Sequence, residues 1–307
     1  MKNIWTPLML VLVLLLSACS SQSAENAEPT PADQSQANTI TYQSEEGPVE
    51  VPADPKRVVV LSSFTGNVLA LHVPLVGVDS WSKMNPNFHE PLQDVEEVSD
   101  ESLEKIIELN PDLIIGLSTV KNLDKLKQIA PTVTFTYGKV DYLTQHLEIG
   151  KLLNKEKEAQ AWIDDFKKRA QKAGEEIKAK IGEDATVSVI ENFNKQLYVY
   201  GDNWGRGTEI LYQEMKLNMP EKVKQLALKD GYYALSLEVL PEFAGDYLIF
   251  SKNKETDNSF QETAAYQSIP AVKNNRVLEA NAQEFYFNDP LTLELQLDFF
   301  LKHFLGN

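Results

Sequence analysis

One long amphipathic stretch divides this sequence into two halves and limits the folds open to it. Between Glu156 and Ile181, apolar residues recur every three or four positions and charged residues fill the positions between them. This spacing predicts a single helix of about 26 residues, or about 39 Å, which Gly174 weakens somewhat. A coiled-coil stem is the alternative, but no second heptad stretch offers a partner. We therefore expect this helix to connect two compact lobes.

Strand and helix patterns alternate on both sides of this stretch. Short apolar runs typical of strands lie at 57–61, 75–78, 113–116, 132–135, 186–190, 197–201, 247–250 and 276–279. Helical patterns lie at 66–72, 100–109, 121–129, 142–153, 208–215, 221–226, 237–243 and 290–305, and a hairpin is expected over 39–51. Such alternation predicts βαβ units. The expected fold class is therefore α/β, with two lobes built on central, largely parallel sheets and joined by one long helix.

The N-terminal segment predicts the compartment. Lys2 precedes an apolar run from Leu8 to Leu16, and small residues then lead to Cys19, the sole cysteine. The run has the length of a secretory signal rather than of a membrane span. Its end, Leu-Ser-Ala-Cys, resembles the bacterial lipobox, in which the cysteine becomes the acylated first residue; a plain signal peptide with a chance cysteine is the alternative. We expect a lipid-anchored protein on the extracytoplasmic face of the cell membrane.

The expected order of parts follows from these patterns. It runs from a lipoprotein signal peptide at 1–18 through a disordered tether at 19–38 to an N-terminal α/β lobe at 39–154, a linking helix at 155–181 and a C-terminal α/β lobe at 182–307. The tether is assigned because it is rich in Ser, Ala, Gln, Glu and Pro. A formal net charge of −16 argues against nucleic acid as a partner.

No pattern of catalytic or metal-binding residues stands out. A single cysteine leaves no internal disulfide and no cysteine-ligated metal, and the four histidines lack metal-ligand spacing. The chain has no Gly-x-Ser-x-Gly elbow and no phosphate loop. We expect no enzyme, no cofactor and no metal bound directly by the protein. A secreted reductase or hydrolase on the same lobes is the alternative from the enzyme class.

The segment from Leu197 to Gly207 is the most informative about function. An alternating apolar strand ends in a glycine-rich turn that carries Trp204 and Arg206, and a helical pattern follows. Ligands of α/β folds bind where strands end and helices begin, and Arg206 is the one arginine of four at such a place. Aromatic residues gather at similar places: Tyr137, Tyr198, Tyr200 and the run Phe285-Tyr286-Phe287. These residues predict an aromatic cleft between the lobes, although each tyrosine alone fits a half-buried core position equally well.

The small number of arginines bounds the charge of the ligand. A ferric tris-catecholate is strongly negative and favours several Arg or Lys side chains around it. A ferric tris-hydroxamate is close to neutral. Aromatic walls with one arginine, whose planar fork can reach several oxygens, fit the ferric tris-hydroxamate better.

A short internal repeat places one glutamate in each half. Ser102-Leu103-Glu104 precedes the strand at Leu113, and Ser236-Leu237-Glu238 precedes the strand at Tyr247, with equal spacing from glutamate to the aspartate that opens the strand. Two carboxylates on related surfaces can dock a roughly two-fold partner. The alternative is that both are first-turn glutamates that favour their helix dipoles.

Several motifs together resemble one family. Tyr-Gly-Asp-Asn-Trp-Gly-Arg-Gly at 200–207 is similar to the pocket motif of FhuD-type lipoproteins, the ferric hydroxamate siderophore-binding components of Gram-positive iron-uptake ABC transporters. Further similar pieces are Asp-Pro-Lys-Arg at 54–57, Pro-Asp-Leu-Ile-Ile at 111–115 and Asn-Asp-Pro at 288–290. The resemblance runs over nearly the whole mature chain.

This resemblance implies roles for particular residues. It implies that Trp204 and Arg206 contact the hydroxamate iron centre, with Tyr198 and Tyr137 beside them, while Tyr286 stands where relatives can carry Trp. Glu104 and Glu238 match the pair that meets arginines of the permease. Ser62, Thr65, Trp81 and Thr119 are looser candidates on the first lobe. It also implies a shallow cleft and limited hinge motion.

The predicted function is therefore that of a monomeric, membrane-tethered receptor. It captures a ferric hydroxamate siderophore of ferrichrome or ferrioxamine type and delivers it to an ABC permease with its ATPase. The iron is held by the siderophore. The alternative within the binding class is another iron chelate, such as a catecholate siderophore or haem, or a cobalamin.

Overall fold

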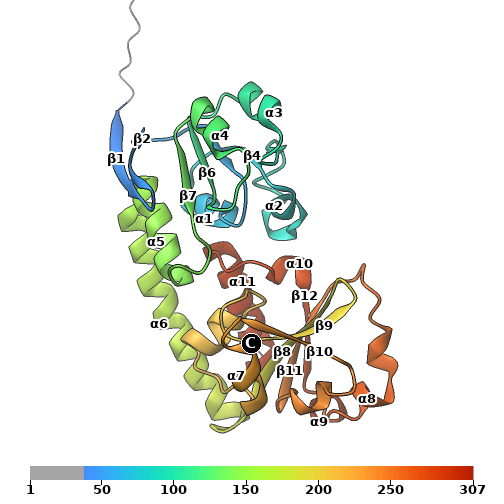
Figure 1. The fold of residues 1–307 in the computed structure, drawn as a ribbon. Helices are drawn as coiled ribbons and strands as arrows, with labels where there is room; N and C mark the ends of the chain where they lie inside the picture. The colour runs from blue at the N-terminus through green and yellow to red at the C-terminus, as the bar shows by residue number, and fades with distance from the viewer. Residues whose placement is uncertain (1–37, 307) are drawn as a thin grey trace, which may run out of the picture. The chain divides into compact units, whose positions relative to one another are not determined.

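Two five-stranded sheets form the centres of two lobes in residues 38–306, the part of the chain that the computed structural model describes (Figure 1). The predicted lipidation at Cys19, the signal peptide and nearly all of the tether lie outside the described residues. None of the helices in residues 38–306 has the length and apolar character that a membrane span requires.

The first sheet is parallel throughout, as predicted. Its strand order is β5-β4-β3-β6-β7. The strands are β3 (Val58–Val60), β4 (Leu75–Val78), β5 (Glu96–Glu97), β6 (Leu113–Leu117) and β7 (Thr132–Phe135). The helices of this lobe are α1 (Thr65–Ala70), α2 (Ser80–Met84), η1 (Pro86–Phe88), α3 (Leu103–Glu108) and α4 (Leu123–Ile129). All three residues of β3 are buried, which is typical of a parallel strand between helical layers. The expected hairpin is confirmed as β1 (Thr39–Ser44) and β2 (Gly47–Pro52).

The second sheet is mixed rather than largely parallel. Its order is β10-β9-β8-β11-β12, with β8 (Val187–Phe193), β9 (Gln196–Tyr200), β10 (Tyr232–Leu235), β11 (Tyr247–Lys252) and β12 (Val277–Asn281). β8, β11 and β12 are parallel, but β9 is antiparallel to both β8 and β10. The reversal occurs at a two-residue turn, Asn194-Lys195, in which both residues have positive φ, as a tight hairpin turn requires.

The helical segments of the second lobe are short except at the C-terminus. They are η2 (Glu209–Glu214), α7 (Glu221–Ala227), η3 (Leu240–Glu242), η4 (Ser259–Glu262), α8 (Ala264–Gln267), α9 (Pro270–Lys273), α10 (Ala282–Phe285), α11 (Pro290–Phe300) and η5 (Leu301–Leu305). The helix predicted at 237–243 is wrong: a turn leads into the single 3₁₀ turn η3. Pro241 lies inside this segment, and it lacks the N–H that a longer helix needs and disfavours helical backbone before it.

The linking helix α6 (Glu156–Ile181) has the predicted bounds. It follows α5 (Tyr142–Leu152), and the two helices are labelled one after the other in Figure 1. Ala159 of α6 packs in the core of the first lobe, whereas Phe166 and Ile177 pack in the core of the second. One helix therefore contributes to both cores.

Gly174 is a packing requirement of α6 rather than a weakness. It is buried against the backbone of Met215, just after η2, and a Cβ at this position would overlap the Met215 carbonyl group. The glycine therefore lets the linking helix approach the η2 segment closely, and η2 leads back to the glycine-rich turn.

The end of the chain returns to the first lobe. α11 packs against α1, and Phe287 and Leu291 join the apolar core of the first lobe. Asp289 caps α11 by accepting hydrogen bonds from the backbone N–H groups of Leu291 and Thr292. The two lobes are thus connected by packed side chains as well as by α6.

Candidate ligand-binding site

An aromatic pocket lies between the lobes. Its cavity volume is about 450 Å³, within the range of small-molecule sites. It is lined by Ser62, Ser63, Asp79, Trp81, Tyr137, Phe193, Tyr198, Tyr200, Trp204, Arg206, Tyr232, Tyr286, Phe287 and Asn288. The five side chains predicted to bind the ligand, Tyr137, Tyr198, Trp204, Arg206 and Tyr286, are all in this set. The structure therefore brings together residues that the sequence spreads over 150 positions.

Positive φ angles shape the turn that carries Arg206. Gly205, Arg206 and Gly207 have φ values of 67°, 60° and 82°. A side chain at Gly205 would also overlap the carbonyl oxygen of Tyr286, so the position needs glycine for space as well as for conformation. Arg206 is held in this uncommon conformation by a hydrogen bond of 2.7 Å from its N–H to the Phe285 carbonyl. The turn therefore fixes the backbone from which the guanidinium extends.

Arg206 is a buried, paired cation. Its Nε donates to Glu191 Oε2 over 2.8 Å, and its Nη1 donates to the Trp204 carbonyl over 3.0 Å. The guanidinium carbon lies 4.8 Å from the ring centroids of both Tyr200 and Tyr286. Nη2 makes no hydrogen bond to any other residue in 38–306. The sequence placed Arg206 at the end of a strand but gave no partner for it, whereas the structure pairs its charge with a carboxylate.

Glu191 is the principal residue that the sequence analysis missed. It lies in β8, its side chain is fully buried, and Tyr200 donates a hydrogen bond to the same Oε2 atom over 2.9 Å. The predicted strand ended one residue earlier, at Ile190. A charged residue that directly continues an apolar run is the signal that could have located it. Burial and the nearby Glu191 carboxylate raise the pKa of Tyr286 to about 12, so this phenol is neutral at physiological pH.

Tyr137 and Trp204 face each other across the opening between the lobes. Their rings meet edge to face with centroids 5.8 Å apart, and they are 44% and 37% exposed. Tyr232 lies 5.1 Å from Trp204 and 5.8 Å from Tyr198. Tyr232 was missed because β10 was not expected. Exposed aromatic rings that already contact one another offer a preformed apolar surface to a ligand.

The looser candidates on the first lobe divide into two groups. Trp81 and Ser62 line the pocket, and the Trp81 ring lies 5.3 Å from that of Tyr286. Thr65 is buried and accepts a hydrogen bond from Ser82, and Thr119 is exposed; neither lines the pocket.

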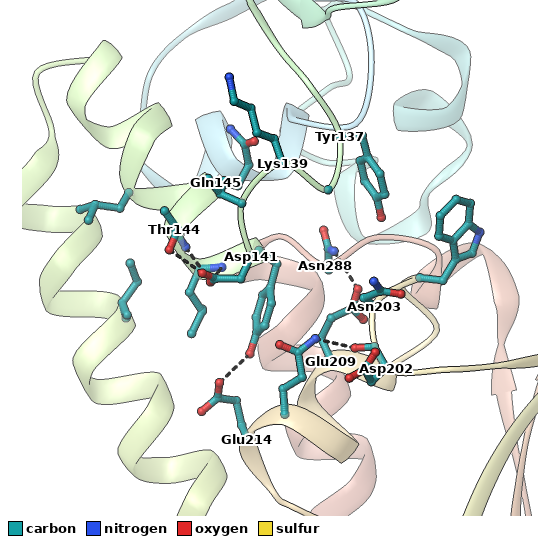
Figure 2. Close-up of a pocket in the computed structure, with 18 of the residues that line it drawn as sticks. Tyr137, Lys139, Asp141, Thr144, Gln145, Asp202, Asn203, Glu209, Glu214 and Asn288 are labelled. Atoms are coloured by element: carbon teal, nitrogen blue, oxygen red, sulfur yellow. Dashed lines mark hydrogen bonds between the residues drawn. The ribbon is translucent and has the colours of Figure 1, made fainter. Parts of the chain in front are cut away.

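A larger polar chamber adjoins the aromatic pocket (Figure 2). Its volume is about 1000 Å³, and it shares Ser63, Tyr137, Trp204 and Asn288 with the pocket. Glu209 lies in its wall and accepts hydrogen bonds from Asn288 Nδ2 and from the N–H of Gly205. Burial raises the pKa of Glu209 in spite of these bonds. Glu209 therefore ties the glycine-rich turn to the segment before α11.

The two glutamates of the internal repeat lie outside both the aromatic pocket and the polar chamber. Glu104 is exposed in the first turn of α3. Glu238 is also exposed, but it lies in the turn before η3 and not in a helix, so a helix dipole does not explain it. Residues 38–306 contain no group of three or more His, Cys, Asp or Glu side chains placed to hold a metal ion.

Comparison with known proteins identifies the family. Residues 58–284 match the family described as periplasmic binding protein. The chain is 36% identical to the iron(3+)-hydroxamate-binding protein FhuD of Bacillus subtilis (strain 168), over 94% of this chain and 93% of the relative. The FhuD protein of S. pseudintermedius has a TM-score of 0.80 at 35% identity, covering 88% of this chain and 99% of that one. FhuD2 of Staphylococcus aureus with bound ferrioxamine B has a TM-score of 0.79 at 33% identity, covering 82% and 99%.

The chain belongs to the periplasmic binding protein family. The predicted FhuD-type resemblance and the two-lobed α/β fold are confirmed. Members of this family bind and deliver substrates, so the prediction of a binding protein rather than an enzyme is confirmed as well.

Proposed function

We propose that this protein captures ferric hydroxamate siderophores outside the cytoplasm and delivers them to an ABC permease for iron uptake. The observation that carries the proposal is the aromatic pocket, whose lining holds seven tyrosine and tryptophan rings and one paired guanidinium. Three hydroxamates cancel the charge of ferric iron, so the chelate presents oxygen atoms without a large net charge. An arginine with a free Nη2 atom can donate to those oxygens.

The relatives support this choice of ligand. One is named an iron(3+)-hydroxamate-binding protein, and one solved structure of similar fold holds ferrioxamine B. The adjoining polar chamber leaves room for the hydrophilic arms of such a chelate beside the pocket.

Delivery requires a membrane anchor and a docking surface. Acylation at Cys19 supplies the anchor, and a relative is named a siderophore-binding lipoprotein. Glu104 and Glu238 are exposed, one in each lobe, and supply carboxylates that arginines of a permease can bind.

A titration across chelate classes tests the ligand. Tryptophan fluorescence is followed while ferrichrome, a ferric tris-catecholate, haem or cyanocobalamin is added to the protein. We expect ferrichrome to quench the fluorescence with a sub-micromolar Kd, because the Trp204 indole lines the pocket, and the other ligands to bind more weakly. Tighter binding of any of the other three would contradict the proposal.

A further inference from the structure

The aromatic pocket has almost no net charge. Among its lining residues, Arg206 and Asp79 are the charged ones. Asp79 is 9% exposed, caps α2 and accepts hydrogen bonds from Ser82; burial raises its pKa. Behind the lining, Glu191 contacts Arg206 directly. The pocket therefore contains a cation without presenting a positive surface.

The ion pair cancels the arginine charge at very short range. Arg206 Nε and Glu191 Oε2 are 2.8 Å apart, and the two side chains are 10% and 0% exposed. Charges in such a desolvated place are weakly screened, so an added or removed unit charge acts strongly on a ligand a few ångströms away. The Arg206 guanidinium stays protonated whether or not the Glu191 carboxylate is present.

The carboxylate is poorly explained by stability alone. Glu191 Oε1 is buried and has no hydrogen-bond partner in residues 38–306. Leaving a charged acceptor atom unsatisfied is costly, and apolar replacements of buried ion pairs are often as stable. Glu191 therefore lowers the stability of the fold in a way that a purely structural role does not explain.

We propose that Glu191 is a specificity-determining residue, which neutralises Arg206 so that the pocket accepts uncharged ferric hydroxamates and disfavours anionic ferric chelates. This inference rests on the proposed function. Glu191 acts through Arg206 and does not touch the ligand. Arg206 keeps its Nη2 atom for hydrogen bonding to the chelate, while the Glu191 carboxylate offsets the positive charge of the guanidinium. A tris-catecholate, whose ligands carry twice the charge of hydroxamates, meets no uncompensated cation in the lining of the aromatic pocket.

The test measures a selectivity ratio by calorimetry, namely the Kd of a ferric tris-catecholate divided by the Kd of ferrichrome. Glu191→Gln keeps the size and one acceptor oxygen but removes the charge. We expect it to lower the ratio about tenfold or more through tighter catecholate binding, with the ferrichrome Kd changed less than about threefold. Glu191→Asp keeps the charge and is expected to keep the ratio.

A double variant separates the charge of the pair from the loss of the Glu191 side chain. Arg206→Gln together with Glu191→Gln has no net charge at the pair, so its ratio is expected to return toward that of wild type although both affinities fall. An unchanged ratio in Glu191→Gln, or an equal shift in Glu191→Asp, would overturn the proposal. Failure of wild type to bind ferrichrome would contradict the proposed function itself, and this inference with it.

Discussion

Several groups of the protein hold the Arg206 side chain, so its removal affects more than ligand contact. Arg206→Ala leaves Glu191 buried without its cation, and breaking a buried pair in this way typically costs about 3–5 kcal/mol. We expect the free energy of unfolding, measured in urea without ligand, to fall by about that amount.

The matched variant replaces both partners. Arg206→Met with Glu191→Leu leaves no unpaired charge, and it is expected to recover most of the stability lost in Arg206→Ala. Equal instability of the single and double variants would contradict the assignment of the lost stability to an unpaired buried charge.

His146 makes the stability of the protein depend on pH. It is 2% exposed, its Nδ1 lies 3.0 Å from Asn67 Oδ1, and burial lowers its pKa from 6.5 to about 4. The unfolded chain therefore binds a proton at a pH where the folded chain does not. This contribution to stability is complete above about pH 6.5 and is lost as the pH falls toward 4, by about 3 kcal/mol in all.

Thermal unfolding between pH 7.5 and 4.5 measures this effect. Burial also raises the pKa of the Glu209 and Asp289 carboxyl groups. The informative quantity is therefore the difference between wild type and His146→Gln, which keeps an amide near Asn67 but does not titrate. We expect a smaller loss of Tm on acidification in the variant. The same loss in both proteins would contradict the assignment to His146.

At the residue scale, the sequence predicted the pocket-lining side chains better than their pairing. The turn with glycines at 205 and 207 located Trp204 and Arg206, because it lies where a predicted strand ends and a helical pattern begins. Glu191 could have been located as a charged residue that continues an apolar run, but its contact with Arg206 could not be predicted, because that contact depends on how β8 and β9 pair. That pairing follows from a hairpin turn, Asn194-Lys195, which lacks the usual glycine.

At the scale of elements, β10 presents adjacent tyrosines to opposite faces of the second sheet. Tyr232 lines the pocket and is 39% exposed, whereas Tyr233 is 38% exposed and stacks on Phe243, 5.6 Å away. Tyr232→Ala is expected to weaken ferrichrome binding about threefold to tenfold, the usual worth of an aromatic contact. Tyr233→Ala is the matched control and is expected to leave the Kd unchanged. Equal effects of the two variants in the fluorescence titration would remove β10 from the site.

The longest helix was predictable, and the shortest helices were not. The helix α6 extends over seven turns of regular apolar spacing, so its bounds agree with the prediction. The helices α2, α8, α9 and α10 have four or five residues each, too few for any periodicity to appear. Caps define them instead: Asp79, Thr263 and Asn281 accept hydrogen bonds from the first N–H groups of three of them.

At the scale of the whole molecule, ligand capture and delivery are expected to use separate surfaces. Glu104 and Glu238 lie outside the pocket. Glu104→Ala with Glu238→Ala is expected to leave the ferrichrome Kd unchanged but to reduce ferric siderophore uptake by cells about tenfold, equivalent to about 1.4 kcal/mol of docking free energy. Glu108→Ala with Glu255→Ala removes two other exposed carboxylates and is the control. Normal uptake by the first double variant would contradict the docking role.

The most direct test of the central claim is a crystal structure of the protein with ferrichrome. The claim predicts iron-bound hydroxamate oxygens within hydrogen-bonding distance of Arg206 Nη2, with the Trp204 and Tyr137 rings against the chelate and the pair of Arg206 and Glu191 intact. A chelate seated only in the polar chamber, or anywhere out of reach of Arg206, would contradict it.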